Sequence, residues 1–317
     1  MQVVMIGLDA MTYGSGHVTR LNRIRRLMRD NDPKIYQAKN YNDLKQILKT
    51  NINLNIILDV CSPKFYRQLP KKKFFVKNSN YRKVIAIEGL AQDRHIADLF
   101  CENIKTILPY CINKEELKCH DLQNTIYGPH LHTYGGLTWD GKSKLYDQRA
   151  KGKHKILLSA GYSDPASITR EVLTGIQKCN ELRNSVIVYY TSSPATTYNF
   201  DKSQFKFAKD IGQDFFKYIQ NSTHMISSSG LIKYDGTLNR KKLYLIHPDQ
   251  HHRRANSAFE TQTSVDSCMI GELSSDVLNT FVKCGMKASF KEWPEEQYYN
   301  VMSGRPIKEA IINLLSE

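Results

Sequence analysis

The sequence lacks the features of a membrane-spanning, disulfide-stabilised or disordered chain. No apolar run approaches the roughly 18 residues that a helix needs to cross a bilayer. The seven cysteines are odd in number and form no Cys-x-x-Cys pair, which argues against a disulfide framework or a zinc ribbon. Hydrophobic residues make up 41% of the chain, too many for a disordered protein. We therefore expect a cytoplasmic protein whose 317 residues form one large domain or two ordinary ones.

Acidic residues are too few to balance the basic ones. The chain has 45 Lys and Arg against 31 Asp and Glu, a formal net charge of +14. Residues 1–150 hold 24 basic and 14 acidic side chains, a net +10, whereas residues 151–317 hold 21 and 17, a net +4. Eight basic residues and no acidic residue fall between Lys64 and Lys83. This charge predicts a polyanionic partner, and the alternative is a solvated basic loop.

Short apolar runs alternate with helical patterns in both halves, which is typical of an α/β protein with mostly parallel sheets. The expected strands are Val3–Leu8, Ile56–Val60, Val84–Ile87, Lys155–Ser159, Val186–Tyr190, His224–Ser228 and Leu243–His247. The expected helices are Val18–Met28, Ala166–Lys178, Ile232–Lys241 and a C-terminal segment from Glu295. The apolar periodicity lapses over residues 141–153, so we expect two Rossmann-like domains, residues 1–150 and 151–317.

The first strand leads into a glycine-containing loop, Gly14-Ser-Gly16-His17, at the start of a helix. Glycines let the backbone turn tightly and approach a ligand, and a helix start attracts negative charge. At this position a neutral imidazole is favoured for His17, which could then accept a proton. The third glycine of the dinucleotide fingerprint is missing, so NAD binding is poorly supported. The alternative is a structural turn with a capping histidine.

The second half repeats this order of strand, small-residue loop and helix. The loops are Gly161-Tyr162-Ser163-Asp164-Pro165, Ser227-Ser228-Ser229-Gly230 and His247-Pro248-Asp249-Gln250. Such loops follow the carboxyl ends of parallel strands, where α/β sheets bind their ligands. Helix capping is the alternative for the first of them, because Ser163, Asp164 and Pro165 all suit a helix start.

Together these segments resemble the UDP-sugar hydrolases of the pseudaminic acid pathway and, more distantly, the lipid-linked N-acetylglucosaminyltransferase of peptidoglycan synthesis. Residues 14–20 resemble the hydrolases' Gly-x-Gly-His-x-x-Arg, and residues 158–165 resemble their Phe-Gly-Gly-Ser-Asp-Pro segment. Residues 84–98 resemble their Ile-Asp-Asp-Leu-Ala-Asp-Arg-x-His-x-x-Asp stretch. The order of the segments holds from residue 5 to about residue 256. The resemblance implies the glycosyltransferase-B architecture, two Rossmann-like domains facing a cleft, with the acceptor on the first domain and the nucleotide on the second.

The sequence also departs from these families. Six residues after Gly230, where the peptidoglycan enzyme has a ribose-binding glutamate, stands Gly236, with Asp235 beside it. The hydrolases' Asn-Gln reads Asp249-Gln250 here. The basic first half favours a transferase with an anionic acceptor over a hydrolase. Three histidines, His247, His251 and His252, do not complete a metal-ligand pattern, because Pro248 interrupts any shared helical face.

We therefore expect a metal-independent glycosyltransferase that takes a UDP-sugar donor, needs no other cofactor and glycosylates a hydroxyl group of an anionic acceptor. In the boldest form of this hypothesis the acceptor is DNA that bears a hydroxylated base. In another form the acceptor lies at a membrane surface. The alternative is a UDP-sugar hydrolase of a nonulosonic acid pathway. The expected catalytic residues are His17, as general base, and Asp249. The expected nucleotide-sugar residues are Gly14, Gly16, Gly161, Tyr162, Ser163, Ser228, Ser229, Gly230, Asp235 and Gln250, and the expected acceptor residues are Arg20, Lys71, Lys72 and Lys73.

Overall fold

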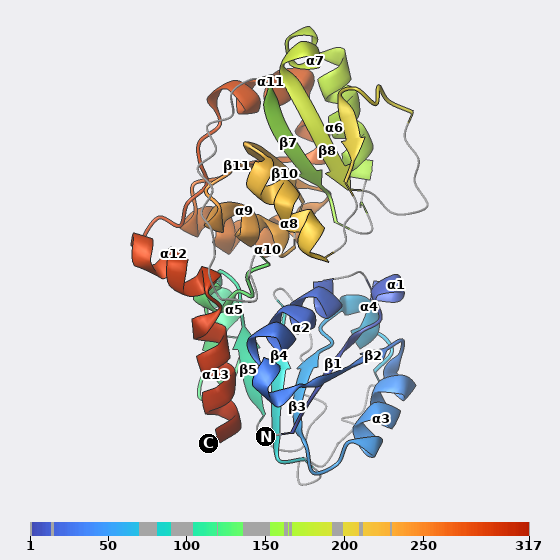
Figure 1. Ribbon diagram of the computed structural model, residues 1–317, viewed down its shortest axis with the longest axis vertical. Coiled ribbons are helices and arrows are strands. Elements are labelled where there is room, and N and C mark those ends of the chain that lie inside the picture. Colours follow the sequence, from blue (N-terminus) through green and yellow to red (C-terminus); the bar gives the residue numbers. More distant parts are fainter. Residues whose placement is uncertain are drawn as a thin grey trace. The chain divides into compact units, whose positions relative to one another are not determined.

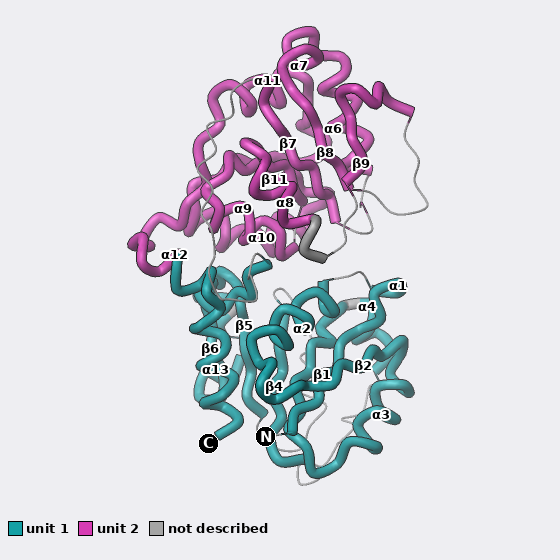
Figure 2. The backbone as a smooth tube through the Cα atoms, viewed as in Figure 1, with its two compact units in different colours: residues 1–142, 299–317 teal, residues 143–298 magenta. Residues whose placement is uncertain are grey.

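A computed structural model of the protein divides into two compact units (Figures 1 and 2). Unit 1 comprises residues 1–142 and 299–317, and unit 2 comprises residues 143–298. The structure describes residues 2–13, 16–69, 81–89, 104–118, 120–135, 153–161, 164, 167–191, 199–208, 212–228 and 230–316. The domain boundary expected near residue 150 therefore lies outside the described residues.

The sheet of unit 1 has six parallel strands in the described residues, in the order β2-β1-β3-β4-β5-β6. Helices cover both of its faces, so consecutive strand residues are buried and the central strands are largely apolar, with polar residues at the ends of β3 and at the start of β4. The register places Gly7 of β1 beside Asp59 of β3. The strands are β1 (Val3–Leu8), β2 (Lys34–Ala38), β3 (Asn55–Asp59), β4 (Lys83–Ile87), β5 (Lys105–Leu108) and β6 (Thr125–Tyr127).

Two hydrophobic layers hold the helices of unit 1 against this sheet. One layer joins Ile6, Leu44 and Leu58, and the other joins Met5, Leu21 and the last helix of the chain. That last helix, α13, packs here through the apolar stripe that ends in Leu315. The helices are α1 (Ala10–Tyr13), α2 (Gly16–Leu27), α3 (Tyr41–Thr50), α4 (Pro63–Tyr66), α5 (Lys114–Leu117), α12 (Glu295–Met302), which crosses the unit boundary, and α13 (Arg305–Ser316), with 3₁₀ turns at Arg29–Asn31 and Pro129–Leu131.

Unit 2 repeats the plan with six parallel strands in its described part, in the order β12-β11-β10-β7-β8-β9. Ile156, Leu158 and Ile226 lie in the core that α6 and α11 cover, and α8, α9 and α10 also pack on the sheet. The strands are β7 (His154–Ser159), β8 (Val186–Thr191), β9 (Phe205–Phe207), β10 (His224–Ser227), β11 (Lys242–His247) and β12 (Asp266–Met269). The helices are α6 (Ile168–Lys178), α7 (Asn180–Ser185), α8 (Gly212–Asn221), α9 (Ile232–Leu238), α10 (Gln250–Gln262) and α11 (Ser275–Cys284), with a 3₁₀ turn at Ile270–Glu272.

The two parallel sheets confirm the predicted α/β fold class. Three expected helices have different ends. The helix expected from Ala166 begins at Ile168, after Ser167 in a left-handed backbone (φ 54°). The first helix begins at Gly16, so it contains His17, and α9 ends at Leu238, shortly before Arg240 adopts a left-handed backbone (φ 50°) that a helix does not continue through. None of the helices among the described residues is both long enough and apolar enough to cross a membrane.

Candidate functional site

The most distinctive polar cluster of unit 1 lies at the carboxyl edge of its sheet. His17 is the second residue of α2, and Asp59 is the last residue of β3. Nδ1 of His17 lies 2.7 Å from Oδ1 of Asp59, and the Asp59 side chain is fully buried. Gly7 makes this approach possible, because a Cβ there would lie 2.9 Å from Leu21 of α2. The helix therefore sits close enough to β1 for His17 to reach the neighbouring strand.

Arg20 holds the other side of the same carboxylate. One helical turn after His17, its Nε donates to Oδ2 of Asp59 at 2.7 Å and its Nη2 to Oδ1 at 3.3 Å. Its Nη1 donates to the hydroxyl of Tyr110, which follows β5. Arg20 is only 5% exposed. In the structure its guanidinium is thus committed to positioning Asp59 inside unit 1, which differs from the acceptor-binding role expected from the sequence.

This arrangement fixes the charge of Asp59 and the orientation of His17. Burial alone would raise the pKa of Asp59, but the charges of Arg20 and His17 outweigh burial and hold that pKa below its usual range. The ionised carboxylate accepts the Nδ1–H of His17, so the Nε2 of a neutral imidazole carries the lone pair. Among the described residues no group bonds Nε2, and the His17 side chain is 12% exposed. Such a histidine can accept a proton from a hydroxyl group or a water molecule.

A second buried carboxylate, Glu88, follows β4 at the same edge. Its Oε2 accepts a hydrogen bond from the hydroxyl of Tyr66 at 3.0 Å, and the backbone N–H of Gly89 donates to Sγ of Cys61 at 2.9 Å. Burial and the neighbouring Glu88 raise the pKa of the Cys61 thiol, which therefore stays protonated. Glu88 and Cys61 are thus held in structural hydrogen bonds at the carboxyl edge of the sheet. His17 remains the candidate base of this edge.

In unit 2, the predicted loops follow three adjacent strands, β7, β10 and β11. Gly161 and Gly230 adopt left-handed backbones, with φ of 89° and 121°, and no atom of the described residues lies within 4 Å of a Cβ built on either residue. Open space next to the backbone is what a ligand needs in order to contact the peptide groups closely. The hydroxyl of Ser228, which is 2% exposed, donates to the carbonyl of Ala160 at 2.8 Å and ties two of the loops together.

Other expected site residues of unit 2 lie in or at the start of helices. Asp249 is the N-cap of α10, where its Oδ1 accepts from the backbone N–H of His252 at 2.8 Å. That hydrogen bond and the imidazole of His252 lower the pKa of Asp249. Gln250 is the exposed first residue of the helix, and Asp235 is 1% exposed within α9. Asp249 therefore has a capping role that by itself explains an aspartate at this position.

Several expected site residues lie outside the described residues, so their predicted roles stay predictions. They are Gly14, Lys71, Lys72, Lys73, Tyr162, Ser163 and Ser229. Gly16 is described, and no atom of the other described residues lies within 4 Å of a Cβ built on it. In the described part of the chain, no three His, Cys, Asp or Glu side chains are grouped so that they could hold a metal ion.

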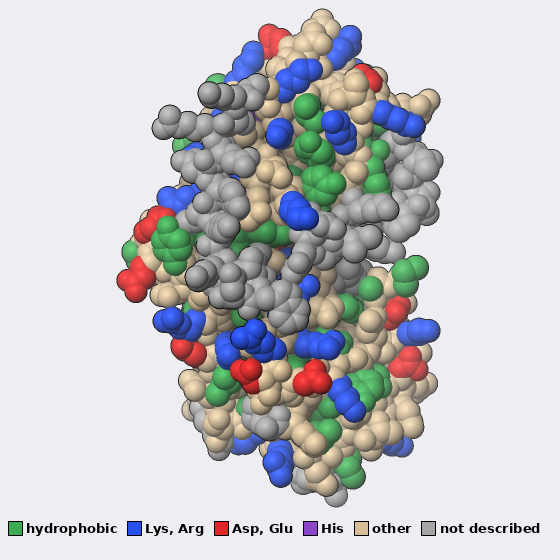
Figure 3. Space-filling view, viewed as in Figure 1, with side chains coloured by type: hydrophobic (Ala, Val, Ile, Leu, Met, Phe, Trp, Pro, Cys, Tyr) green, Lys and Arg blue, Asp and Glu red, His purple; other side chains and the backbone are tan. Residues whose placement is uncertain are grey.

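Exposed basic side chains accompany the candidate base of unit 1. Lys64 and Arg67 lie in and just after α4, which follows the strand that ends in Asp59, and both are exposed. Nζ of Lys64 donates to the carbonyl of Thr12 at 3.3 Å, in the short helix α1 that follows β1. Figure 3 shows further Lys and Arg side chains in a row across the visible face of unit 1, with a few acidic side chains among them. Part of the positive charge read from the sequence is thus exposed on unit 1, with Lys64 and Arg67 in the segment that follows β3.

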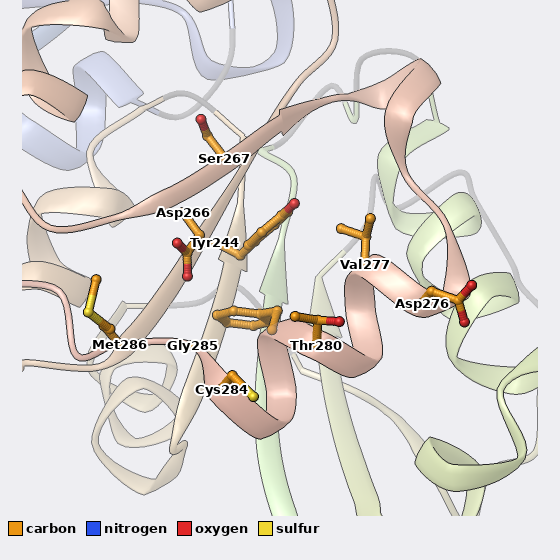
Figure 4. A pocket seen from close by; sticks show the side chains of 10 residues that line it. Tyr244, Asp266, Ser267, Asp276, Val277, Thr280, Cys284, Gly285 and Met286 are labelled. Atoms are coloured by element: carbon orange, nitrogen blue, oxygen red, sulfur yellow. The ribbon is translucent and has the colours of Figure 1, made fainter.

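A cavity of about 550 Å³ lies elsewhere in unit 2 (Figure 4). It is bounded by Tyr244 of β11, Asp266 of β12 and Thr280 and Phe281 of α11. Tyr244 is the third residue of its strand, so the cavity opens beside the body of the sheet, away from the loops that follow His247. We therefore do not assign it to the candidate site.

Solved structures with the same arrangement of elements are numerous, although no protein-family model and no curated protein matches the sequence. Spinosyn forosaminyltransferase SpnP is 11% identical, covers 100% of both chains and has a TM-score of 0.56. UDP-GlcNAc 2-epimerase from Neisseria meningitidis, solved with UDP-GlcNAc, is 10% identical over 100% of both chains, also with a TM-score of 0.56. The fold is that of the glycosyltransferase-B proteins. S. aureus MnaA, solved with UDP, is 9% identical, covers 99% of this chain and 95% of its own, and has a TM-score of 0.54.

Asp59 is the functional candidate that the sequence did not reveal. A signal was present, because a carboxylate stands directly after the apolar run Ile56–Leu58, at the carboxyl end of a predicted strand. An aspartate at a buried strand end is costly without partners. Its partners, however, are 42 and 39 residues away in sequence, and no local spacing pairs them.

Proposed function

We propose that the protein is a glycosyltransferase that takes a UDP-sugar without a metal ion and transfers the sugar to a hydroxyl group of an anionic acceptor. The observation that carries the proposal is the His17–Asp59 pair, at the strand ends of a glycosyltransferase-B fold. His17 removes the proton of the acceptor hydroxyl as that oxygen attacks the sugar carbon, the bond from this carbon to the β-phosphate oxygen breaks and UDP leaves. Asp59 stabilises the imidazolium that forms. Arg20 keeps Asp59 ionised and in place.

The donor is proposed to bind at the loops of unit 2. Gly161 and Gly230 leave open space for its diphosphate beside backbone N–H groups. Structures of the same fold have been solved with UDP and with UDP-GlcNAc, which supports a uridine nucleotide as the ligand. The exposed Lys64 and Arg67 support an anionic acceptor, because they lie next to the strand end that carries Asp59.

The test is UDP release from a panel of UDP-sugars by the purified chain, with and without EDTA. Each sugar is offered with no acceptor, with DNA that carries hydroxymethylated bases, and with anionic liposomes that contain a lipid-linked glycan. We expect release that needs one of these acceptors, survives EDTA and falls about 10²–10⁴-fold in His17→Ala. The matched control is His154→Ala, at the amino end of β7, which should keep full activity.

The other outcomes decide between the alternatives. Release without any acceptor, lost in His17→Ala, would replace the transferase with a UDP-sugar hydrolase. Equal activity in His17→Ala and the wild type would remove His17 from the mechanism. If the chain neither binds nor turns over any UDP-sugar, the proposed function is wrong.

A further inference from the structure

The cavity beside the body of the unit 2 sheet takes no part in the proposed function. It has a volume of about 550 Å³, and the ten residues that line it are all described (Figure 4). They come from β11, β12 and α11 and from the two residues that follow α11. A hollow of this size can hold a small organic molecule.

The floor of the cavity is aromatic and apolar. The rings of Tyr244 and Phe281 are only 6% and 3% exposed, and their centroids lie 5.0 Å apart. Val277 of α11 adds an aliphatic side chain to the lining. Aromatic faces attract cations, and aliphatic surface is favourably covered by hydrocarbon. The floor therefore favours a ligand that combines a hydrocarbon chain with positive charge.

Two carboxylates stand toward opposite ends of this floor. Asp266 comes from β12, where it pairs in register with Tyr244, and Asp276 comes from the first turn of α11. In Figure 4 the side chains of Tyr244, Thr280 and Val277 lie between these two carboxylates. The negative charges are thus separated along the cavity.

The topology gives the same separation. Lys287, shortly after the end of α11, forms a β-bridge with Lys242 at the start of β11, so the end of α11 lies on the same side of the cavity as Asp266. Asp276 stands near the other end of this helix, eight residues before Cys284. Eight residues of α-helix rise by about 12 Å. This spacing suits two charges on one elongated molecule better than a single charge.

The two carboxylates are not neutralised by the described part of the chain. Neither Asp266 nor Asp276 makes an ion pair or a side-chain hydrogen bond there, and the lining contains no Lys, Arg or His. Lys242 and Lys287 lie near the Asp266 end but do not line the cavity. The whole chain carries a net charge of +14, so it does not attract small cations in general. Saturable binding of a cation would therefore report a local site.

We propose that this cavity binds a linear molecule with an ammonium group at each end, a diamine or polyamine, with one ammonium at Asp266 and the other at Asp276. Its hydrocarbon chain lies over Tyr244 and Phe281. A metal ion fits less well, because Mg²⁺ and Ca²⁺ take six or more oxygen ligands and the described residues group no three His, Cys, Asp or Glu side chains. The inference is independent of the proposed function, which uses other parts of the chain.

The experiment titrates the full chain with octane-1,8-diamine and with octylamine at constant ionic strength. Calorimetry gives the Kd, with saturation-transfer NMR for the weaker ligand. We expect the Kd of the diamine to be about 3–5-fold lower than that of the monoamine, since it forms one more ion pair at the protein surface. Equal affinity for the two amines, or no saturable binding of the diamine, would overturn the inference.

Variants locate the binding. Asp266→Asn and Asp276→Asn each remove one charge without changing the volume, and each should raise the Kd of the diamine about 3–5-fold. The double variant should bind the diamine and the monoamine equally. The matched control is Glu171→Gln, which removes an exposed carboxylate from the first turn of α6, another helix of unit 2, and should change neither affinity.

The remaining outcomes are also decisive. Diamine binding that survives in the double variant would place the ligand elsewhere, and displacement of the diamine by equimolar Mg²⁺ would assign the cavity to a metal ion. If an asparagine variant does not fold, Thr280→Trp fills the cavity from an exposed position of α11 and leaves both carboxylates in place. It should abolish diamine binding, and unchanged binding in this variant would refute the site.

Discussion

Replacing Asp59 by asparagine should lower both the stability and the activity of the protein, because each oxygen of the carboxylate accepts a different hydrogen bond. The Asp59 carboxylate accepts from His17 at one oxygen and from Nε of Arg20 at the other, both at 2.7 Å. Asparagine has a single oxygen. If that oxygen faces His17, its NH₂ group meets the N–H of Arg20, and the guanidinium is left buried without its counter-charge. If the amide is reversed, its NH₂ group faces His17 and forces the imidazole proton onto Nε2, which then cannot act as a base.

Removing one partner of a buried ion pair costs about 3–5 kcal/mol in the free energy of unfolding. We expect a loss of this size in Asp59→Asn, measured by urea unfolding followed by far-UV circular dichroism. In a double-mutant cycle with Arg20→Met, the coupling energy should reach about 2–3 kcal/mol. The matched control is Asp9→Asn, after β1, where an exposed carboxylate accepts from Thr12 at 3.0 and 2.8 Å, and its cost should not exceed about 1 kcal/mol.

The pH dependence supplies an independent check on the same residue. The folded state holds the pKa of Asp59 below its ordinary value of 3.8, so its contribution is complete above that value and is lost as the pH falls below it. The stability difference between the wild type and Asp59→Asn should therefore shrink below about pH 4. A coupling energy under about 0.5 kcal/mol, or a stability difference that does not change with pH, would refute the buried ion pair.

Two further predictions concern positions away from the candidate site. His224 is 1% exposed, with Nε2 2.9 Å from the carbonyl oxygen of Val282, and burial, helped by Lys242, lowers its pKa to about 4. Its neutral form is favoured in the folded state, so stability should fall by up to about 3 kcal/mol as the pH drops from 6.5 to 4, and His224→Phe should flatten that slope in urea titrations at each pH. Gly304→Ala should cost about 2 kcal/mol by thermal unfolding, because φ is 71° and the new Cβ would overlap Leu27. Gly271→Ala, which has open space at the Cβ position, should melt like the wild type, and equal melting of both variants would contradict the strain at Gly304.

The sequence located most of the central strands, because a strand buried on both faces is a continuous apolar run, but it missed β5, which pairs on both sides and begins with a lysine and a threonine. Such runs mark β1, β3, β4 and β7 to within a residue or two. It did not reveal the edge strands. The residues of β12, Asp-Ser-Cys-Met, carry no such run, and β2 includes exposed lysine and glutamine. An edge strand is held by pairing on one side only, so its composition is less constrained.

The residues of the candidate site could be predicted only where they belong to a motif of consecutive residues. His17 was found because a glycine loop between a strand and a helix is a local pattern. Its contact with Asp59 depends on the register that sets Gly7 beside Asp59. This relation has no fixed separation in sequence. It arises when the sheet and its covering helices assemble.

Under the proposed function, the electrostatics at the sheet edge of unit 1 argue for one task, proton transfer. At the edge of unit 1, opposite charges are in contact, since Arg20 neutralises Asp59 and leaves little net field for an anion. Such a pair suits proton transfer, where the carboxylate stabilises a transient imidazolium. Under the proposed function, changes at Asp59 should therefore lower kcat with little effect on UDP affinity.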